Sequence, residues 1–365
     1  MLSSLAWIAL SLAAAPSLSV PGAIAAIADD QDTAAAIARL RQAGKPGLWA
    51  LADAAKKASG KAKGRLFLAI GGFGGPEAEW ALFVELKDSD PEGVAGAVRG
   101  LGQGSGPSSC SSVLSLAGSS EGIVRDAVVE ALVQKKGCGA ASIKRLYGSP
   151  SELGRETALR YVVAANDPVG AELQNEALGD ASGRVRAQAA ELAAVRHDKS
   201  QLYTLSDIAK GPDEAAGQAA ARAITAIGGF SAPNELAAVI ADARTTQPAW
   251  RAAALGLRTL GNEGYRALLK GMARTKDPAR REAVAEIAAH ALSDADVQAA
   301  VELLEDAELS LAGAAILDRA GDRAVSIAEA RRASALPELE AGIVDYLKHR
   351  SARPPQDLAA AAPAE

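Results

Sequence analysis

Few residues in this chain are spaced for catalysis or metal binding. The three histidines, His197, His290 and His349, lie far apart in the sequence, so no two of them have the i, i+4 spacing of a zinc site on one helix. Gly60-Lys61 lacks the upstream glycine and the following hydroxyl of a nucleotide-binding loop. We therefore predict a protein that is not an enzyme and that has no catalytic residue, cofactor or metal ion.

One acidic cluster could bind a cation. Glu302, Glu305 and Asp306 share a face of the segment VELLEDAELS, and carboxylate oxygens are ligands that Ca²⁺ prefers. The alternative, which we favour, is an ordinary solvated helix face.

The two cysteines raise the question of a disulfide. Cys110 and Cys138 follow the helices expected at 94–98 and 124–132, so they occupy equivalent positions in neighbouring repeats. Helices in neighbouring layers lie about 8–10 Å apart, whereas a disulfide needs Cα atoms within about 7 Å. The Gly- and Ser-rich stretch before Cys110 could close this gap, and two free buried thiols are the alternative.

The elements that position these residues repeat along the chain. A helix that opens near an Arg and carries Ala and Leu at helical spacing recurs about ten times, roughly every thirty residues, and such a period is typical of a helical solenoid. The clearest copies begin at Ile123, Gly154, Gly183, Ala215, Ala249 and Ala279.

Each copy is followed by a shorter amphipathic stretch, so the repeat unit is a pair of helices. Asp90-Pro91 and Asp277-Pro278 are helix-start signals, because Asp caps free backbone N–H groups and Pro fits a first turn. We predict an all-α fold, a right-handed α-α superhelix of about ten two-helix repeats, in one solenoid domain over residues 29–350. Residues 351–365 are Pro-interrupted and low in complexity, which predicts a disordered tail.

The copies combine an acidic or proline break, a Val/Ile-Arg pair, regularly spaced Ala and Leu, and a terminal Gly. This pattern resembles the HEAT repeat family, in particular the short bacterial HEAT-like repeats of phycobilisome lyase subunits. The resemblance extends from about Asp32 to His349. It implies that the repeated arginines form a structural ladder, each pairing with an acid in a neighbouring turn. The arginines at that place are Arg125, Arg155, Arg186, Arg251 and Arg281, and the candidate acids include Asp180, Asp213 and Asp277.

The start of the chain is typical of an export signal. No charged residue precedes Asp29, Leu5–Ala15 is an apolar stretch, and Ala26-Ile27-Ala28 fits a cleavage site. We predict that residues 1–28 are a signal peptide and that the protein is exported to the periplasm or cell envelope. A retained anchor and a merely apolar cytosolic start are the alternatives; Pro16, Pro21 and Gly22 interrupt the long apolar helix that an anchor needs.

Charge limits the class of partner. The formal net charge of −5 argues against nucleic acid. The first repeats are nevertheless basic, and Lys56, Lys57, Lys61 and Lys63 could contact an anionic lipid surface or an acidic partner. The other interpretation is a solvated helix end, where lysines suit the helix dipole.

The family resemblance implies a scaffold that holds a partner protein along the concave face of the solenoid, which we expect the second helix of each pair to line. Tyr and Arg are favoured anchors at interfaces. The predicted partner-binding residues are Lys144, Tyr147, Tyr203, Tyr265, Arg266 and Lys270. Core packing is the alternative role for each tyrosine, and an accessory or lyase-like subunit of an enzyme complex is the alternative function.

Overall fold

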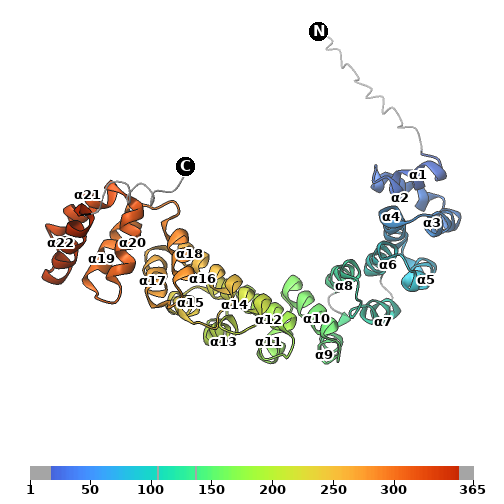
Figure 1. Cartoon of the computed structure of the whole chain (residues 1–365). Helices are drawn as coiled ribbons and strands as arrows, with labels where there is room; N and C mark the ends of the chain where they lie inside the picture. Colours follow the sequence, from blue (N-terminus) through green and yellow to red (C-terminus); the bar gives the residue numbers. More distant parts are fainter. Residues whose placement is uncertain (1–17, 105–106, 136–137, 353–365) are drawn as a thin grey trace, which may run out of the picture. The chain divides into compact units, whose positions relative to one another are not determined.

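The computed structural model describes residues 18–104, 107–135 and 138–352 (Figure 1). Residues 1–17 of the predicted signal peptide and 353–365 of the predicted tail lie outside this range. The described chain divides into two compact units, the first ending at Ala165 and the second starting at Asn166.

The first unit is built from antiparallel helix pairs. Its elements are α1 (Val20–Ala28), α2 (Thr33–Gln42), α3 (Lys45–Lys57), α4 (Gly60–Gly71), α5 (Gly75–Val84), the 3₁₀ turn η1 (Glu85–Lys87), α6 (Pro91–Gln103), α7 (Pro107–Ser115), α8 (Gly122–Gln134), α9 (Ala140–Tyr147) and α10 (Glu152–Ala165). In each pair the even-numbered helix comes first and carries the repeated motif, and the odd-numbered helix is the second.

The second unit continues the same numbering. Its elements are α11 (Gly170–Leu178), α12 (Gly183–Val195), η3 (Lys199–Gln201), α13 (Leu202–Ala209), α14 (Glu214–Ile227), α15 (Ala232–Ala241), α16 (Gln247–Thr259), α17 (Gly261–Arg274), α18 (Pro278–Ala289), α19 (Asp294–Glu302), η4 (Leu303–Glu305), α20 (Ser310–Ala320), α21 (Asp322–Arg332) and α22 (Pro337–Ser351).

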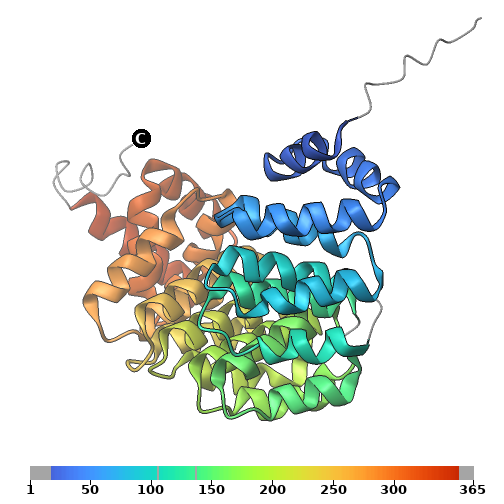
Figure 2. The same cartoon turned by 90° about the vertical axis from the view of Figure 1, so that its right-hand side faces the viewer.

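Within each unit the pairs stack in layers (Figures 1 and 2). First helices pack on first helices, as in α4 on α6 on α8 and in α12 on α14 on α16, and second helices pack on second helices, as in α15 on α17. The predicted fold class, an all-α array of stacked helix pairs, is therefore confirmed.

The helix starts and the close packing follow from the sequence. Asp90 and Asp277 accept hydrogen bonds from backbone N–H groups in the first turns of α6 and α18, as their Asp-Pro signals predict. Glycines let α4 and α6 come into backbone contact: a Cβ added at Gly96 would lie 2.1 Å from the Gly64 carbonyl oxygen. The layers are thus held together by small residues in an Ala-rich core.

Helix α1 lies inside the segment predicted to be a signal peptide. It packs on α2 and α4, and Ala23 and Ile27 are fully buried. The Arg65 guanidinium donates to the Ala28 carbonyl at 2.9 Å, and the Arg39 guanidinium donates to the Leu18 carbonyl at 2.8 Å. The cleavage predicted after Ala28 would remove this helix from the first unit. Among the helices within the described ranges, none is long and apolar enough to span a membrane.

Candidate protein-binding surface

Two of the predicted anchor tyrosines are not on the surface. Tyr147 is 4% exposed and Tyr265 is 1% exposed, which corrects their assignment as partner-binding residues. Both rings lie on the core side of their helices, and the Tyr265 hydroxyl donates to the Ala288 carbonyl at 3.3 Å. Burial raises the pKa of Tyr265 well above its usual value. These tyrosines therefore stabilise the array instead of recognising a partner.

Tyr203 does lie on the surface, with 72% of its area exposed on α13. It lines a hollow of about 470 Å³ together with Arg186, Asp207 and Asp213. Arg186 and Asp213 form an ion pair at 3.6 Å across this hollow. The hollow lies within the second unit and offers one exposed aromatic ring beside mixed charges.

Arg266 and Lys270 lie one helical turn apart on α17. With Phe230, Pro233 and Glu263 they line a second hollow of about 400 Å³, which lies between α15 and α17. The sixth predicted residue, Lys144, is exposed on α9 in the first unit. Within the second unit, Tyr203 lines one hollow, and Arg266 and Lys270 line another.

The first unit carries an exposed aromatic cluster that was not predicted from the sequence. Trp49 on α3 and Trp80 on α5 meet edge to face, with ring centres 6.3 Å apart, and Phe83 and Val84 lie beside them on α5. All four are at least 43% exposed. Hollows of about 180 Å³ and 300 Å³ lie against Trp80, the first also lined by Trp49 and the second by Phe83.

The helical phase of α5 could have revealed this cluster. Ala78, Ala81 and Leu82 occupy the buried stripe, so Trp80 and Phe83 fall outside it. Apolar residues off the core stripe of an amphipathic helix are the signal of an exposed apolar face.

The basic first repeats are largely neutralised. Lys63 is 8% exposed and pairs with Asp88, so its assignment to an exposed anionic-surface contact is wrong. Its ammonium hydrogen bond holds the pKa of Asp88 below the usual range. Lys57 pairs with Asp53 at 2.7 Å. The remaining cluster members are Lys56, which pairs with Glu85 at 3.6 Å, and Lys61, which is exposed.

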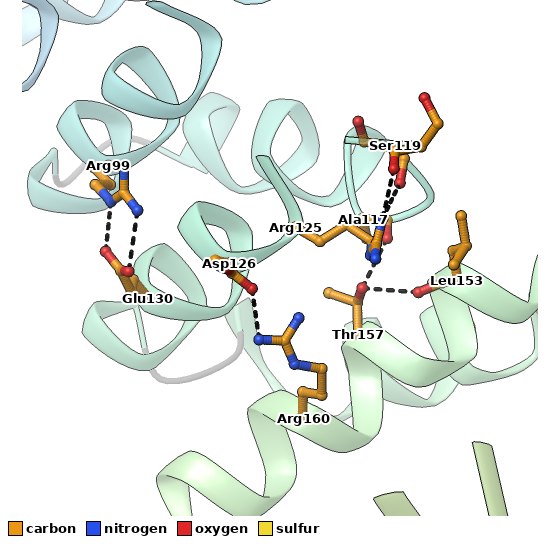
Figure 3. A network of polar contacts seen from close by, with 10 residues as sticks. Arg99, Ala117, Ser119, Arg125, Asp126, Glu130, Leu153, Thr157 and Arg160 are labelled. Carbon is orange, nitrogen blue, oxygen red and sulfur yellow. Dashed lines mark hydrogen bonds and ion pairs between the residues drawn. The ribbon is translucent and has the colours of Figure 1, made fainter. Parts of the chain in front are cut away.

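The repeated arginines donate hydrogen bonds to backbone carbonyls in turns. The Arg125 guanidinium donates to the carbonyls of Ser119 and Ser120, at 2.7 Å and 3.0 Å, in the turn just before its own helix α8 (Figure 3). The same contact recurs from Arg155 to Ser149 and Pro150, from Arg186 to Asp180 and Ala181, and from Arg281 to Thr275.

This geometry refines the predicted arginine ladder. Of the candidate acids, Asp213 pairs with Arg186, while Asp277 caps α18. Arg251 lies over the Trp250 ring at 5.7 Å. Further ion pairs between layers join other residues of the first helices, Arg99 with Glu130 and Arg160 with Asp126, both at 2.6 Å (Figure 3).

The two cysteines are joined. Cys110 and Cys138 form a disulfide with Cα atoms 5.8 Å apart. It links α7 to the residues just before α9. Helices α7 and α9 are the second helices of neighbouring pairs. Cys110 lies within α7, whereas Cys138 lies in the turn before α9, so the bridge joins a helical residue to a turn residue.

Within 18–104, 107–135 and 138–352, no group of three or more His, Cys, Asp or Glu side chains is placed to hold a metal ion. In the acidic cluster at the end of α19 and in η4, the Glu302 carboxylate pairs with Arg331 at 2.6 Å. Gly118-Ser119-Ser120-Glu121-Gly122 has the spacing of a nucleophile motif, but it joins α7 to α8, whereas that motif follows a strand.

No family model matches this chain, and no curated protein is similar to it in sequence. One similar solved structure is the crystal structure of an engineered protein from the Northeast Structural Genomics Consortium. The two are 18% identical over 94% of this chain and 92% of that chain, with a TM-score of 0.33. At that score the similarity adds no argument to the stacked helix pairs described above.

Proposed function

We propose that the protein is a non-catalytic, exported scaffold that binds a partner protein through the second helices of its HEAT-like pairs. One observation carries the proposal. The strongly exposed aromatic side chains of the described chain lie on second helices or on the turn leading into one: Trp49, Trp80, Phe83, Tyr203 and Phe230.

First helices differ in this respect. Their exposed large apolar residues are aliphatic, such as Val133, Val195 and Leu255. Aromatic side chains supply much of the binding energy at protein interfaces, and clustered exposed apolar groups are typical of binding surfaces. The contrast between exposed aromatic residues on the second helices and exposed aliphatic residues on the first helices therefore favours the second helices as the binding surface. The Cys110–Cys138 disulfide supports an oxidising, extracytoplasmic location.

Site-specific photo-crosslinking in the native cells tests this proposal. A photoreactive amino acid at Trp80 or at Phe230 should cross-link to a discrete protein, because both side chains are exposed, at 61% and 96%. Leu255 on α16 is the matched control, since it is 58% exposed on a first helix. Equal cross-linking from Leu255, or none from Trp80 and Phe230, would contradict the proposal.

A further inference from the structure

The hollow between α15 and α17 has the most distinctive chemistry of the second-helix surface. Glu263, Arg266, Ala267 and Lys270 lie on one face of α17, and Gly229, Phe230, Pro233 and Asn234 close the other side. The space between them is about 400 Å³. It lies entirely within the second unit.

The charge of this hollow is opposite to that of the chain. Arg266 is 46% exposed, and its ion pair within the described part of the chain is a long one, to Glu263 at 3.8 Å. Lys270 makes no ion pair within 4.0 Å to any residue in the described ranges. A third cation, Lys199, lies at the rim, because a Cβ added at Gly229 would be 3.8 Å from its Nζ. Glu263 is the one carboxylate in the lining.

An apolar wall adjoins these cations. Phe230 is 96% exposed, and Pro233, Leu260 and Ala267 continue the apolar lining below it. Covering an exposed phenylalanine ring with a ligand is favourable, because it removes apolar area from water. A ligand that fills the hollow would thus meet apolar contact on one side and two or three cations on the other.

We infer that this hollow binds an acidic segment of the partner protein that carries an apolar side chain. The inference rests on the proposed function, which it narrows. The apolar side chain covers Phe230 and Leu260, and the flanking carboxylates pair with Arg266 and Lys270. A protein segment fits better than an anionic membrane, because a segment can leave the Glu263 carboxylate, which is 80% exposed, in water. A uniformly anionic surface would be repelled by it.

Peptide titration by NMR tests the inference on the full chain. The probes are a short peptide of Asp, Glu and Phe, the same peptide with Asn and Gln in place of the acids, and the same peptide with Lys in their place. We expect the acidic peptide to bind most tightly, to shift the backbone amides of 229–234 and 260–270, and to bind more weakly as salt is raised.

Charge reversal supplies the decisive variant. The double substitution Arg266→Glu and Lys270→Glu should weaken the acidic peptide roughly tenfold, the effect expected of two exposed charge contacts, and should make the lysine peptide the better ligand. Lys276→Glu is the matched control, since Lys276 is an exposed cation outside the hollow, and it should leave affinity unchanged. Both positions are exposed, so the fold is retained.

Several outcomes would overturn the inference. One is that the neutral peptide binds as tightly as the acidic peptide, and another is that the amide shifts lie away from the hollow. The others are that the acidic peptide does not bind at millimolar concentration, and that the charge-reversed variant does not prefer the lysine peptide. Binding of phosphatidylglycerol vesicles that needs Arg266 and Lys270, without peptide binding, would identify a membrane contact instead. If peptides fail while a photoreactive group at Trp80 still captures a protein, the partner is bound elsewhere and only this inference falls.

Discussion

At the scale of single residues, the repeated arginine donates hydrogen bonds to backbone carbonyls of the turn before its own helix. Arg125 is 8% exposed and serves two carbonyls of the preceding turn, so the loss of its side chain leaves both acceptors short of a donor. Hydrogen bonds to a charged group contribute about 1.5–3 kcal/mol. The repetition of the same contact at Arg155 and Arg186 makes it a property of the repeat.

Arg125→Ala should therefore lower the free energy of unfolding by about 2 kcal/mol, measured by urea denaturation. Arg125→Lys should recover only part of this, because a single ammonium cannot reproduce the planar fork of the guanidinium. Arg145→Ala on α9 is the control, as Arg145 is exposed, and its effect should stay within about 0.5 kcal/mol. Equal unfolding free energies of Arg125→Ala and Arg145→Ala would show that the Arg125 hydrogen bonds do not stabilise the fold.

The buried pair of Lys63 and Asp88 gives a pH-dependent prediction. Their side chains are 10% and 15% exposed, so Asp88→Asn leaves a buried ammonium without its counter-charge and should cost about 3 kcal/mol at pH 7. Because the pKa of Asp88 is lowered below 3.8 in the folded protein, this stabilisation is fully present above pH 3.8 and is lost as pH falls through the folded pKa.

The measurement is the difference in unfolding free energy between wild type and Asp88→Asn from pH 7 to pH 2. The difference should be constant at neutral pH and shrink below pH 3.8. Asp53→Asn is the control, since the Lys57–Asp53 pair is 74% and 66% exposed and should contribute less than about 1 kcal/mol. A difference that persists unchanged at pH 2 would mean that the pair is not its source.

At the scale of elements, the disulfide ties neighbouring second helices of the first unit. Cys110 and Cys138 are 28 residues apart, and closing a loop of that length stabilises a fold by about 3 kcal/mol. Replacing both by Ser should lower the unfolding midpoint of the first unit, followed through the fluorescence of Trp49 and Trp80. Reduced wild type should then match the variant. An unchanged midpoint in both would exclude a stabilising bridge.

The helix pairs could be predicted from sequence because each rests on local signals that repeat: an Asp cap, a Pro in the first turn, and Ala and Leu at helical spacing. The exposed residues of the candidate surface could not be predicted as reliably. Tyr203 and Tyr265 are both on second helices, but a difference in helical phase leaves one 72% and the other 1% exposed. The burial of Lys63 could not be predicted, because its ion-pair partner Asp88 lies 25 residues further along the chain. Phase and cross-layer pairing are set by tertiary packing.

At the scale of the whole molecule, the predicted cleavage after Ala28 would remove α1 and the contacts that α1 makes with α2 and α4. A mature chain that begins at Asp29 would lack Ala23 and Ile27, which are fully buried against the first unit, and would expose the surfaces of α2 and α4 that they cover. Burial of an isoleucine side chain alone contributes about 1.5–3 kcal/mol. The arginines Arg39 and Arg65 would also lose the carbonyls of Leu18 and Ala28.

A protein beginning at Leu18 should therefore unfold at a higher temperature than one beginning at Asp29, and the added stability should be confined to the first unit. Hydrogen exchange resolves this, because amides of α2 and α4 should exchange faster in the shorter protein, while those of α14 and α16 in the second unit should not change. Replacing Ile27 by Ser in the longer protein should reproduce most of the loss, since it removes the buried side chain and keeps the backbone. If the two proteins are equally stable, α1 adds nothing to the stability of the first unit, and removal of residues 1–28 would leave the stacked helix pairs intact.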